Sequence, residues 1–506
     1  MTTIYQKTLC NLFLVNVIIV LIIIYSGIYS KTQQNIEGVR ILRHHQTIAQ
    51  VEKNLIRLAK DVDITQNMME KSITHFGDVS KFHRLCKEIF LKQRKISIAI
   101  LGGSASASFH TTSKTKRYFD HVAIFLEEIF NVEIEIVNES LGGTQSIMSS
   151  YCLQNMLNVT NVDIILLEFA INDNFAHVNL RGRTIEDLVR HLKSFPCKEQ
   201  PYVIFANLIS TQILFSNLTK FENCTTVEDE YFNAVAKYYN IAAVSWKNQI
   251  CEKTHKSMIG FKFDDISKPD KNHPTLKGHA QLGYMISFLL LRLYKMFQQN
   301  PSGKSLNTKI PNNLTTMLTK PIDPRVWLAN PACFMIKHDI EQMCNNKNNN
   351  VYICLKERKS FRFEQIRNIP GIYSNTPKGY LKFQCVVNKE TFKNRKKIKI
   401  GFAYRAPLLE TTYLKLNVFS KNTSYLSENI LFPLCVFYVT RTYESNEILT
   451  LTGREFTVEF KPVATEKDNF KLYLVALLIG FVDDSFMVIP NNSTTGGKTV
   501  REHHHQ

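Results

Sequence analysis

The sequence lacks the short motifs that mark most nucleotide and metal sites. Its stretch Leu101-Gly-Gly-Ser104 matches neither the G-x-G-x-x-G pattern of dinucleotide-binding folds nor the G-x-x-x-x-G-K-[ST] pattern of phosphate-binding loops. No two of the 11 cysteines have C-x-x-C spacing, and the spacing of a zinc site is absent. These absences argue against a nucleotide cofactor and a structural zinc ion, so we expect no cofactor and no metal.

Acidic residues are scarce relative to basic ones. The chain has 44 Asp and Glu against 62 Lys and Arg, which gives a formal net charge of +18. Such a balance permits attraction to nucleic acid, anionic lipid or acidic glycans. With 44% hydrophobic and 21% charged residues in 506 positions, the composition is that of a folded chain with room for at least two cores.

One apolar run is long enough to cross a membrane. Residues 10–29 carry no charge and are rich in Ile, Val and Leu, and about 20 such residues span the hydrocarbon core. We expect a signal anchor, with residues 1–9 cytoplasmic, in a single-pass type II protein of the Golgi or ER lumen or the cell surface. A cleaved signal peptide is the alternative, because Ser26, Gly27 and Ser30 are small, and the protein would then be secreted. Either location argues against a nucleic-acid partner.

Sequons and cysteines support a lumenal or extracellular location. Eight asparagines stand in N-x-[ST] sequons. Glycosylation is expected at Asn158, Asn217, Asn223, Asn313 and Asn422. Without Cys10, ten cysteines remain, an even count that suits disulfides in an oxidising compartment, although their pairing stays open.

Residues 30–94 carry apolar side chains at helical spacing. The pattern is typical of amphipathic helices that form a stem or pack on the next domain. Within it, Asp61-Val62-Asp63 has the D-x-D form with which many Golgi glycosyltransferases hold a metal and a sugar nucleotide. The surrounding pattern favours a solvated helix face instead.

Residues 95–298 alternate between strand and helix patterns, which predicts a parallel sheet covered by helices. The predicted strands are Ile96–Leu101, Val132–Val137, Asp163–Phe169, Tyr202–Leu208 and Ile241–Trp246. The predicted helices are Tyr118–Phe130, Glu186–Phe195, Thr226–Tyr239 and Leu276–Phe297.

The rest of the chain has a different texture. Residues 299–325 are rich in Pro, Asn, Ser, Thr and Lys and are interpreted as a linker, and residues 491–506 as a polar tail. Short β-like runs between them predict a β-sandwich-like domain at 326–490. These runs are Val351–Leu355, Tyr380–Val387, Ile398–Tyr404, Tyr413–Phe419, Leu431–Thr440, Glu455–Phe460 and Leu472–Val482.

Ser104 stands where the first predicted strand of the α/β region should give way to a helix. Gly102 and Gly103 permit a tight turn there. Taken alone, the stretch is typical of a strand-to-helix turn with a serine N-cap. The position is also the carboxyl edge of a parallel sheet, where open α/β folds bind their ligands.

Three other polar stretches fall at predicted strand ends or just before the last helix: Val137–Ser146, Glu168–Asn174 and Asp270–His279. Together with Gly-Gly-Ser104 they resemble, in order and separation, the four blocks of the SGNH (GDSL-like) hydrolase superfamily, in a eukaryotic Leu-Gly-Gly-Ser variant. The resemblance covers about residues 95–298. It implies a flavodoxin-like three-layer α/β fold.

By this resemblance, Ser104 is a nucleophile and His273 is its general base. Asp270, three residues before the histidine, would hold the imidazole in the required tautomer. The implied oxyanion-hole donors are the backbone N–H of Ser104, a backbone N–H at Gly142 or Gly143, and the side-chain amide of Asn172.

The same residues allow plainer interpretations. Without the other blocks, His273 and Asp270 would be ordinary turn residues and Asn172 a strand-end turn. Ser106 and Ser108 are alternative nucleophiles, disfavoured because they should lie inside the following helix.

The sequence also departs from the superfamily pattern. Gly103 replaces the usual acidic residue before the serine, and Ser140 stands where many members have the oxyanion glycine, which leaves Gly142 and Gly143 as alternatives. Asn138 is a sequon inside the same block, and we expect it to be unmodified because a glycan would crowd the site.

The hypothesis is a membrane-anchored lumenal serine esterase that acts on an acyl ester, with acetyl expected, of a small molecule or a glycan. The basic stretch Lys389–Lys399 would fit an acidic glycan, although such runs are usually solvated surface. A glycan O-acetyltransferase would use the same triad. A non-catalytic glycan- or protein-binding module is another alternative. The hypothesis of a glycosyltransferase depends only on the D-x-D motif. The oligomeric state is open.

Overall fold

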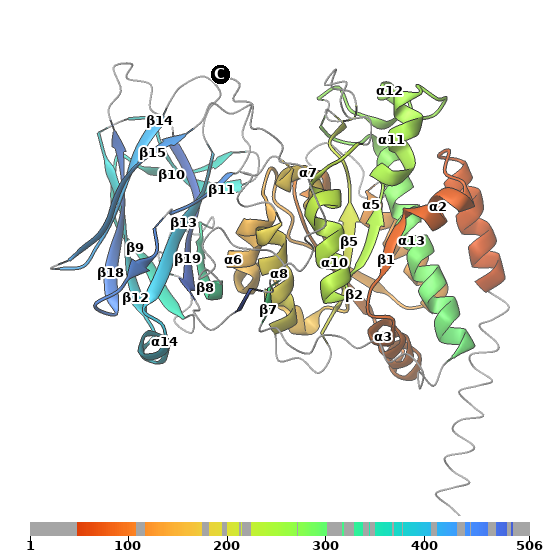
Figure 1. Ribbon diagram of the computed structural model, residues 1–506, viewed down its shortest axis with the longest axis horizontal. Helices are drawn as coiled ribbons and strands as arrows, with labels where there is room; N and C mark the ends of the chain where they lie inside the picture. The colour runs from red at the N-terminus through yellow and green to blue at the C-terminus, as the bar shows by residue number, and fades with distance from the viewer. Residues whose placement is uncertain are drawn as a thin grey trace, which may run out of the picture.

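Two regions of regular structure lie side by side in the computed structural model, an α/β region and a β-rich region (Figure 1). The described residues are 48–107, 117–174, 182–194, 200–211, 214, 224–270, 272–300, 316–317, 328–336, 344, 350–366, 369–376, 378–405, 412–421, 423–432, 441–445, 447–463, 472–482 and 487–488.

The α/β region is built on a six-stranded sheet with the order β1-β6-β5-β4-β2-β3. Strands β2 to β6 are parallel, and β1 runs antiparallel beside β6. The order of the five parallel strands is that of flavodoxin-like folds, as predicted. The strands are β1 (Ile73–Phe76), β2 (Ile96–Gly102), β3 (Ile134–Asn138), β4 (Ile164–Glu168), β5 (Tyr202–Asn207) and β6 (Ala242–Ser245).

Helices cover both faces of this sheet. Every residue of β2, β4, β5 and β6 is buried, which explains why these strands are apolar runs without polar alternation. One face packs on the helix at 48–60, α2 (Gln66–Ser72), α3 (Val79–Lys92), α5 (Tyr118–Phe130), α11 (Lys247–His255) and α13 (Leu276–Gln299). The other face packs on α6 (Ser146–Met156), α8 (Arg183–Ser194) and α10 (Asn233–Tyr239).

The described part of residues 30–94 differs from the predicted helical stem. Strand β1 interrupts its helices and adds an edge to the sheet by pairing with β6. Met69 and Phe82 are buried in the core beneath α13. Since β1 has only four residues, it is too short to show a period of two between the helical patterns that flank it. Residues 48–94 therefore belong to the α/β domain.

The β-rich region is a sandwich of two antiparallel sheets, which confirms the predicted all-β domain. One sheet has the order β15 (Ser424–Phe432), β14 (Thr412–Phe419), β18 (Glu455–Val463), β12 (Tyr380–Val387) and β9 (Val351–Lys359). The other has the order β10 (Arg362–Ile366), β11 (Ile369–Ser374), β19 (Leu472–Val482), β13 (Lys397–Arg405) and β16 (Arg441–Glu444), with β8 (Leu328–Met335) beside β19 and β17 (Leu449–Thr450) beside β13. Of the predicted strand Leu431–Thr440, residues 433–440 lie outside the described residues.

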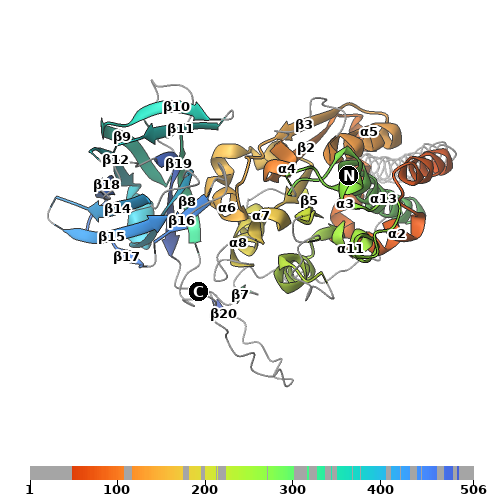
Figure 2. The same cartoon turned by 90° about the horizontal axis from the view of Figure 1, so that it is seen from above.

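Strand β19 shows how the two domains are joined. All of its 11 residues are buried. Leu474 and Leu477 pack into the core of the sandwich, whereas Tyr473 and Leu478 pack into the core formed with α6 and α8. In both views the seven-stranded sheet lies against α6, as a layer shared by the two domains (Figures 1 and 2).

The cysteines form three disulfides among the described residues: Cys152–Cys333, Cys224–Cys251 and Cys344–Cys354. The first joins α6 to β8 and so crosses between the domains. Cys86 and Cys385 are buried and unpaired, so the even count does not mean that every cysteine is paired. Cys197 and Cys435 lie outside the described residues.

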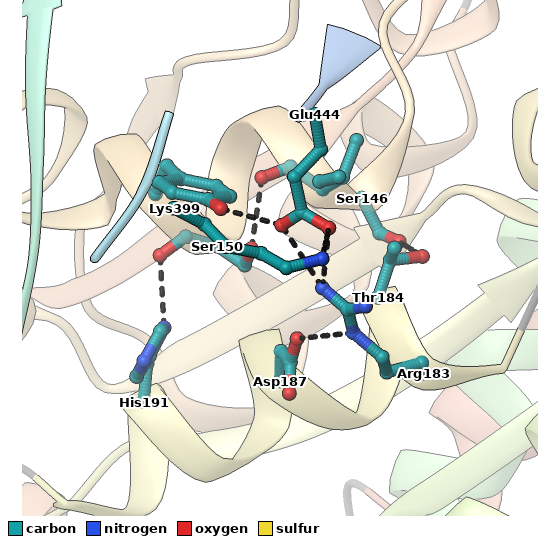
Figure 3. Close-up of polar contacts among 10 residues, drawn as sticks. Ser146, Ser150, Arg183, Thr184, Asp187, His191, Lys399 and Glu444 are labelled. Carbon is teal, nitrogen blue, oxygen red and sulfur yellow. Dashed lines mark hydrogen bonds and ion pairs between the residues drawn. The ribbon is translucent and has the colours of Figure 1, made fainter. Parts of the chain in front are cut away.

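A buried ion pair also joins the domains (Figure 3). Both Glu444 oxygens, on β16, accept hydrogen bonds from Arg183 Nη2 on α8, at 3.0 and 2.9 Å, and Tyr151 Oη donates to Glu444 Oε1 at 2.6 Å. Lys399 Nζ lies 3.4 Å from the same carboxylate. Burial raises the pKa of Glu444, but the cations Arg183 and Lys399 outweigh it and hold this pKa below its ordinary value.

Several predicted segments lie outside the described residues. They are the anchor at 10–29, the tail at 491–506, and the sequons at Asn217, Asn223, Asn313 and Asn422. In the part of the chain that is described, no helix is both long and apolar enough to span a bilayer. Within the predicted linker, Thr316–Met317 forms strand β7, parallel to β20 (Met487–Val488). Asn158 is exposed.

The buried ion pair predicts the effect of Glu444→Gln on stability. The change removes the bidentate carboxylate partner of the buried Arg183 and leaves it only the contact of its Nε with Asp187 Oδ2 at 3.4 Å. Removing one partner of a buried ion pair costs about 3–5 kcal/mol of unfolding free energy. We expect a loss of that size in urea denaturation at pH 7. Because the pKa of Glu444 is depressed in the fold, the wild type loses this stabilisation only as the pH falls below about 4, so the difference between the proteins should shrink there.

Glu447→Gln is the matched control for this measurement. Glu447 lies three residues further along the chain and is exposed, so its replacement should change the unfolding free energy by less than about 0.5 kcal/mol. Equal stability of Glu444→Gln and the wild type would show that the ion pair does not stabilise the domain contact.

Candidate active site

The predicted site residues meet at the carboxyl edge of the six-stranded sheet. Ser104 follows β2 and begins the short helix α4 (Ser104–Ala107), and Asn172 lies in α7 (Ala170–Asp173), which follows β4. Strands β2 and β4 are paired, with Gly102 beside Glu168. The strand order reverses between them, and such a switch point is where open α/β sheets bind ligands.

Ser104, His273 and Asp270 form a chain of hydrogen bonds. His273 Nε2 lies 2.6 Å from Ser104 Oγ, and His273 Nδ1 lies 2.7 Å from Asp270 Oδ2. Asp270 Oδ1 accepts the backbone N–H groups of Asn272 and His273 at 2.9 and 3.0 Å. The arrangement lets Nε2 accept the serine proton while Nδ1 donates to the carboxylate.

Asp270 is suited to remain ionised. Burial raises its pKa, but the hydrogen bonds from the His273 ring and from two backbone N–H groups outweigh this effect and hold the pKa well below its ordinary value. The side chain is 36% exposed and that of His273 is 17% exposed, so the pair lies at the surface of the sheet edge. A permanent carboxylate fixes the orientation of the imidazole.

The turn that carries His273 is braced at both ends. Lys268 N donates to His273 O at 2.9 Å, and Ser267 pairs with Pro274 in an antiparallel bridge. Thr275 is the N-cap of α13, and its hydroxyl accepts from Gly278 N at 3.4 Å. The imidazole is therefore held between a short bridge and the start of the longest helix that the structure describes.

Gly103 lies directly against the Asn172 side chain. A Cβ at position 103 would overlap Asn172 Oδ1, so a side chain at this position has no space in this fold. The backbone N–H of Gly103 donates to Glu168 O at 3.2 Å, which ties the turn to β4. The glycine at position 103 thus has a steric reason, and the Asn172 amide lies beside the turn that presents Ser104.

The loop after β3 forms a tight turn next to Ser104. Thr144 N donates to Leu141 O at 3.2 Å, and Leu141 N donates to Gly102 O at 3.1 Å. Between them lie Gly142 and Gly143, both buried, and Gly143 has a φ of 75°. A positive φ at the third position is the mark of a type II turn. The structure thus brings both predicted glycines to the end of β2.

Ser106, an alternative nucleophile in the sequence, is buried. Its Oγ contacts Tyr118 Oη at 2.9 Å and donates to Glu168 Oε2 at 3.1 Å. Burial raises the pKa of Glu168 to about 8 against the hydrogen bonds from Ser106 and Gly103. Ser106 is therefore part of the support beneath the Ser104 turn, and Ser108 lies outside the described residues.

The roles of Glu168 and Asp173 were not predicted from the sequence. Asp173 accepts Ser146 N at 2.9 Å and Ser146 Oγ at 2.5 Å, and Ser146 Oγ lies 2.7 Å from Thr184 Oγ1. Burial raises the pKa of Asp173 to about 7. The sequence feature that could have indicated these roles is the position of the two acidic residues at the end of an apolar strand. Carboxyl groups buried there need polar partners.

Asn138 and His279 have structural surroundings. Asn138 Nδ2 donates to Ser106 O at 2.9 Å, so the atom that a glycan would modify is engaged at the site. His279 is 3% exposed and stacks on Tyr118 with ring centroids 6.2 Å apart. Its pKa falls to about 3, chiefly through burial.

Neither candidate group of metal ligands includes a residue of the Ser104 site. Asp61 pairs with Arg57, and Asp63 pairs with Lys277, so the D-x-D motif forms two separate ion pairs. Among the described residues, Cys224, Cys251 and His255 also come together, but the two cysteines form a disulfide and so offer no thiolate.

A groove of about 750 Å³ opens at the other end of the sheet, near the start of β2 and β4. Lys81, Arg84 and Lys95 line it, and Arg94 forms a bidentate pair with Asp163 at 2.7 Å there. Nothing in this groove resembles the chain of hydrogen bonds at Ser104, so the carboxyl edge is the better candidate site.

No protein-family model matches the chain, and no curated protein matches it in sequence. Two solved structures of a two-domain esterase active on acetylated mannans are similar in fold. The one co-crystallised with mannopentaose covers 82% of this chain and 99% of its own, with a TM-score of 0.56 and 17% identity. The other covers 82% and 98%, with a TM-score of 0.56 and 18% identity. At such identity the likeness shows a shared fold, an α/β domain with a second all-β domain.

The contact between Gly103 and Asn172 predicts a steric effect of Gly103→Ala. The added methyl group must displace the Asn172 amide or the turn, and overpacking of this kind costs about 1–3 kcal/mol. We expect a fall of that size in the unfolding free energy. Gly453→Ala is the control, because a Cβ there meets no atom within 4 Å. Equal effects of the two changes would contradict the contact.

Proposed function

We propose that the protein is a serine esterase of SGNH type that removes an acyl group, with acetyl the expected one, from a glycan. The observation that carries the proposal is the hydrogen-bonded chain from Asp270 through His273 to Ser104 Oγ. Its position at the switch point of the sheet supports it, because ligands of open α/β folds bind there. The four sequence blocks, with their Leu-Gly-Gly-Ser variant, support the assignment to a eukaryotic branch of the superfamily.

In the first half-reaction, His273 Nε2 takes the hydroxyl proton as Ser104 Oγ bonds to the ester carbonyl carbon. The carbonyl oxygen becomes negative, and the N–H of Ser104, the loop glycine and the Asn172 amide are the proposed donors to it. The tetrahedral intermediate then breaks its bond to the sugar oxygen, which receives the proton from His273. The products are an acyl-enzyme and a free sugar hydroxyl.

In the second half-reaction, His273 takes a proton from water as the water oxygen attacks the acyl carbon. Collapse breaks the bond to Ser104 Oγ, which regains its proton from His273, and releases the carboxylic acid. If a sugar hydroxyl attacks in place of water, the same residues make the protein an O-acetyltransferase. The second nucleophile therefore decides between the two activities.

The proposed substrate class rests on the two-domain architecture. The esterase that shares this fold over 82% of the chain is active on acetylated mannans. In the present chain the β-rich domain packs on α6 and α8, and its Arg405 contacts Gly142 in the loop next to Ser104, so a polymer that reaches the serine would also meet this domain. The net charge of +18 would favour a glycan that carries acidic groups.

The proposed location is the lumen of the secretory pathway or the outside of the cell. The apolar run at 10–29 would be the anchor, or a signal peptide if it is cleaved. Three disulfides, one of which joins the two domains, suit an oxidising compartment. A glycan at the exposed Asn158 would be consistent with this location.

The first prediction from this function concerns reactivity of Ser104. A fluorophosphonate probe should label the wild type, because His273 and Asp270 activate the serine. Ser104→Ala and His273→Ala should lose the label. Ser427 is an exposed serine on β15, so Ser427→Ala should keep it.

Asp270→Asn should lower kcat about 10⁴-fold, because the carboxylate no longer fixes the imidazole tautomer.

A wild type that is folded but unlabelled would count against an activated serine. That result would favour the alternative hypothesis, a non-catalytic binding module. Labelling that survives Ser104→Ala would place the nucleophile elsewhere in the chain.

The second prediction concerns the acyl group and its acceptor. Incubation with acetylated mannan should release acetate in the wild type and not in Ser104→Ala, and mass spectrometry of the glycan should show loss of acetyl groups. Transfer of a labelled acetyl group to an added sugar, without free acetate, would identify a transferase instead. A labelled enzyme that acts on neither the mannan nor p-nitrophenyl acetate would contradict the acetyl assignment.

A further inference from the structure

One arginine of the β-rich domain reaches the loop that follows β3. Arg405 is the last residue of β13, and its side chain is almost entirely enclosed, with 3% of the residue exposed. Its Nη2 donates to the backbone carbonyl of Gly142 at 3.3 Å. The contact joins residues 263 positions apart and connects the second domain to the turn beside Ser104.

The contact fixes the direction of a particular N–H group. The carbonyl of Gly142 and the N–H of Gly143 belong to the same peptide unit. Among the described residues every peptide bond is trans, so these two groups point in opposite directions. Since the Gly142 carbonyl points towards Arg405 in the second domain, the Gly143 N–H points away from that domain.

The rest of the turn is held independently by the first domain. Leu141 N donates to Gly102 O at 3.1 Å, and Thr144 Oγ1 donates to Gly102 O at 3.3 Å and to Leu141 O at 2.7 Å. These bonds fix both ends of the turn to β2, next to the nucleophile. These bonds do not fix the plane of the central peptide between Gly142 and Gly143, so other contacts must determine it.

We propose that Arg405 is a positioning residue for the oxyanion hole, which it serves by holding the Gly142–Gly143 peptide so that Gly143 is the loop donor. The inference rests on the proposed function and deepens it, because it selects Gly143 from the two glycines that the sequence left open. The β-rich domain then completes the catalytic unit of the first domain.

Two physical effects follow from the guanidinium. As a hydrogen-bond donor to the carbonyl, it polarises the peptide and makes the Gly143 N–H a stronger donor. As a buried positive charge behind that peptide, it also favours the negative charge that develops on the substrate oxygen. Both effects act on the transition state and leave binding of the neutral ester almost unchanged.

The test compares kcat and KM for p-nitrophenyl acetate in the full chain and in Arg405→Met. We expect kcat to fall about 10- to 100-fold, short of the loss of a whole donor, with KM within about twofold. Arg405→Lys keeps a charge and one donor, so it should recover part of kcat. If the role of Arg405 were only structural, the variant would have a lower Tm, and kcat would not fall selectively while KM stayed unchanged.

Glu444→Gln is the matched control, because it removes another buried contact between the same two domains without touching the turn. It should lower the Tm at least as much as Arg405→Met and keep kcat within about twofold of the wild type. A kcat in Arg405→Met that equals that of the wild type, or that falls no further than in Glu444→Gln, overturns the inference.

Two further outcomes are decisive. If Arg405→Met does not fold, Arg405→Lys replaces it: a kcat loss of at least about threefold at unchanged KM supports the inference, and wild-type kcat overturns it. If the wild type itself is neither labelled by a fluorophosphonate nor active on the ester, the proposed function fails and the role of Arg405 fails with it. A labelled wild type with an unaffected Arg405→Met refutes only the role of Arg405.

Discussion

The pairing of β2 with β4 is the interaction on which the proposed site depends. Every residue of both strands is buried, so hydrophobic alternation does not specify their register. Polar contacts at the two ends do so instead. At the start, Ser97 N donates to Asp163 Oδ2 at 2.9 Å, and at the end, Gly103 N donates to Glu168 O at 3.2 Å. A slip of one residue would lose both bonds and separate Ser104 from Asn172.

The sequence predicted what depends on local pattern and missed what depends on distant contacts. Apolar runs located the parallel strands, and polar blocks at the ends of two of them pointed to Ser104 and Asn172, because parallel strands bring their carboxyl ends to one edge. His273 follows no strand of the sheet, and only the superfamily resemblance singled it out. Strand β1 was missed because four residues carry too little periodicity. The contact of Arg405 with Gly142 could not be predicted, since the two residues are 263 positions apart. Nothing in the sequence distinguishes an arginine that is buried in such a contact from one on the surface.

The seven-stranded sheet explains why the two domains form one unit. It is one half of the sandwich and also a cover for α6 and α8, so β19 is apolar on both faces. Apolar packing sets the position of the sheet. The Cys152–Cys333 disulfide and the Arg183–Glu444 pair then fix it against rotation.

Burial also divides the carboxyl groups around Ser104 into two kinds. Burial raises the pKa of Glu168 to about 8, which favours its protonated form near neutral pH, whereas the pKa of Asp270 is held well below the ordinary range, which favours its ionised form. An anion at Glu168, beneath the turn that presents Ser104, would repel the negative oxygen of a tetrahedral intermediate. Enzymes that use two carboxyls often separate their pKa values in this way. Here the separation leaves the anion at Asp270, where it would stabilise an imidazolium at His273 in the proposed reaction.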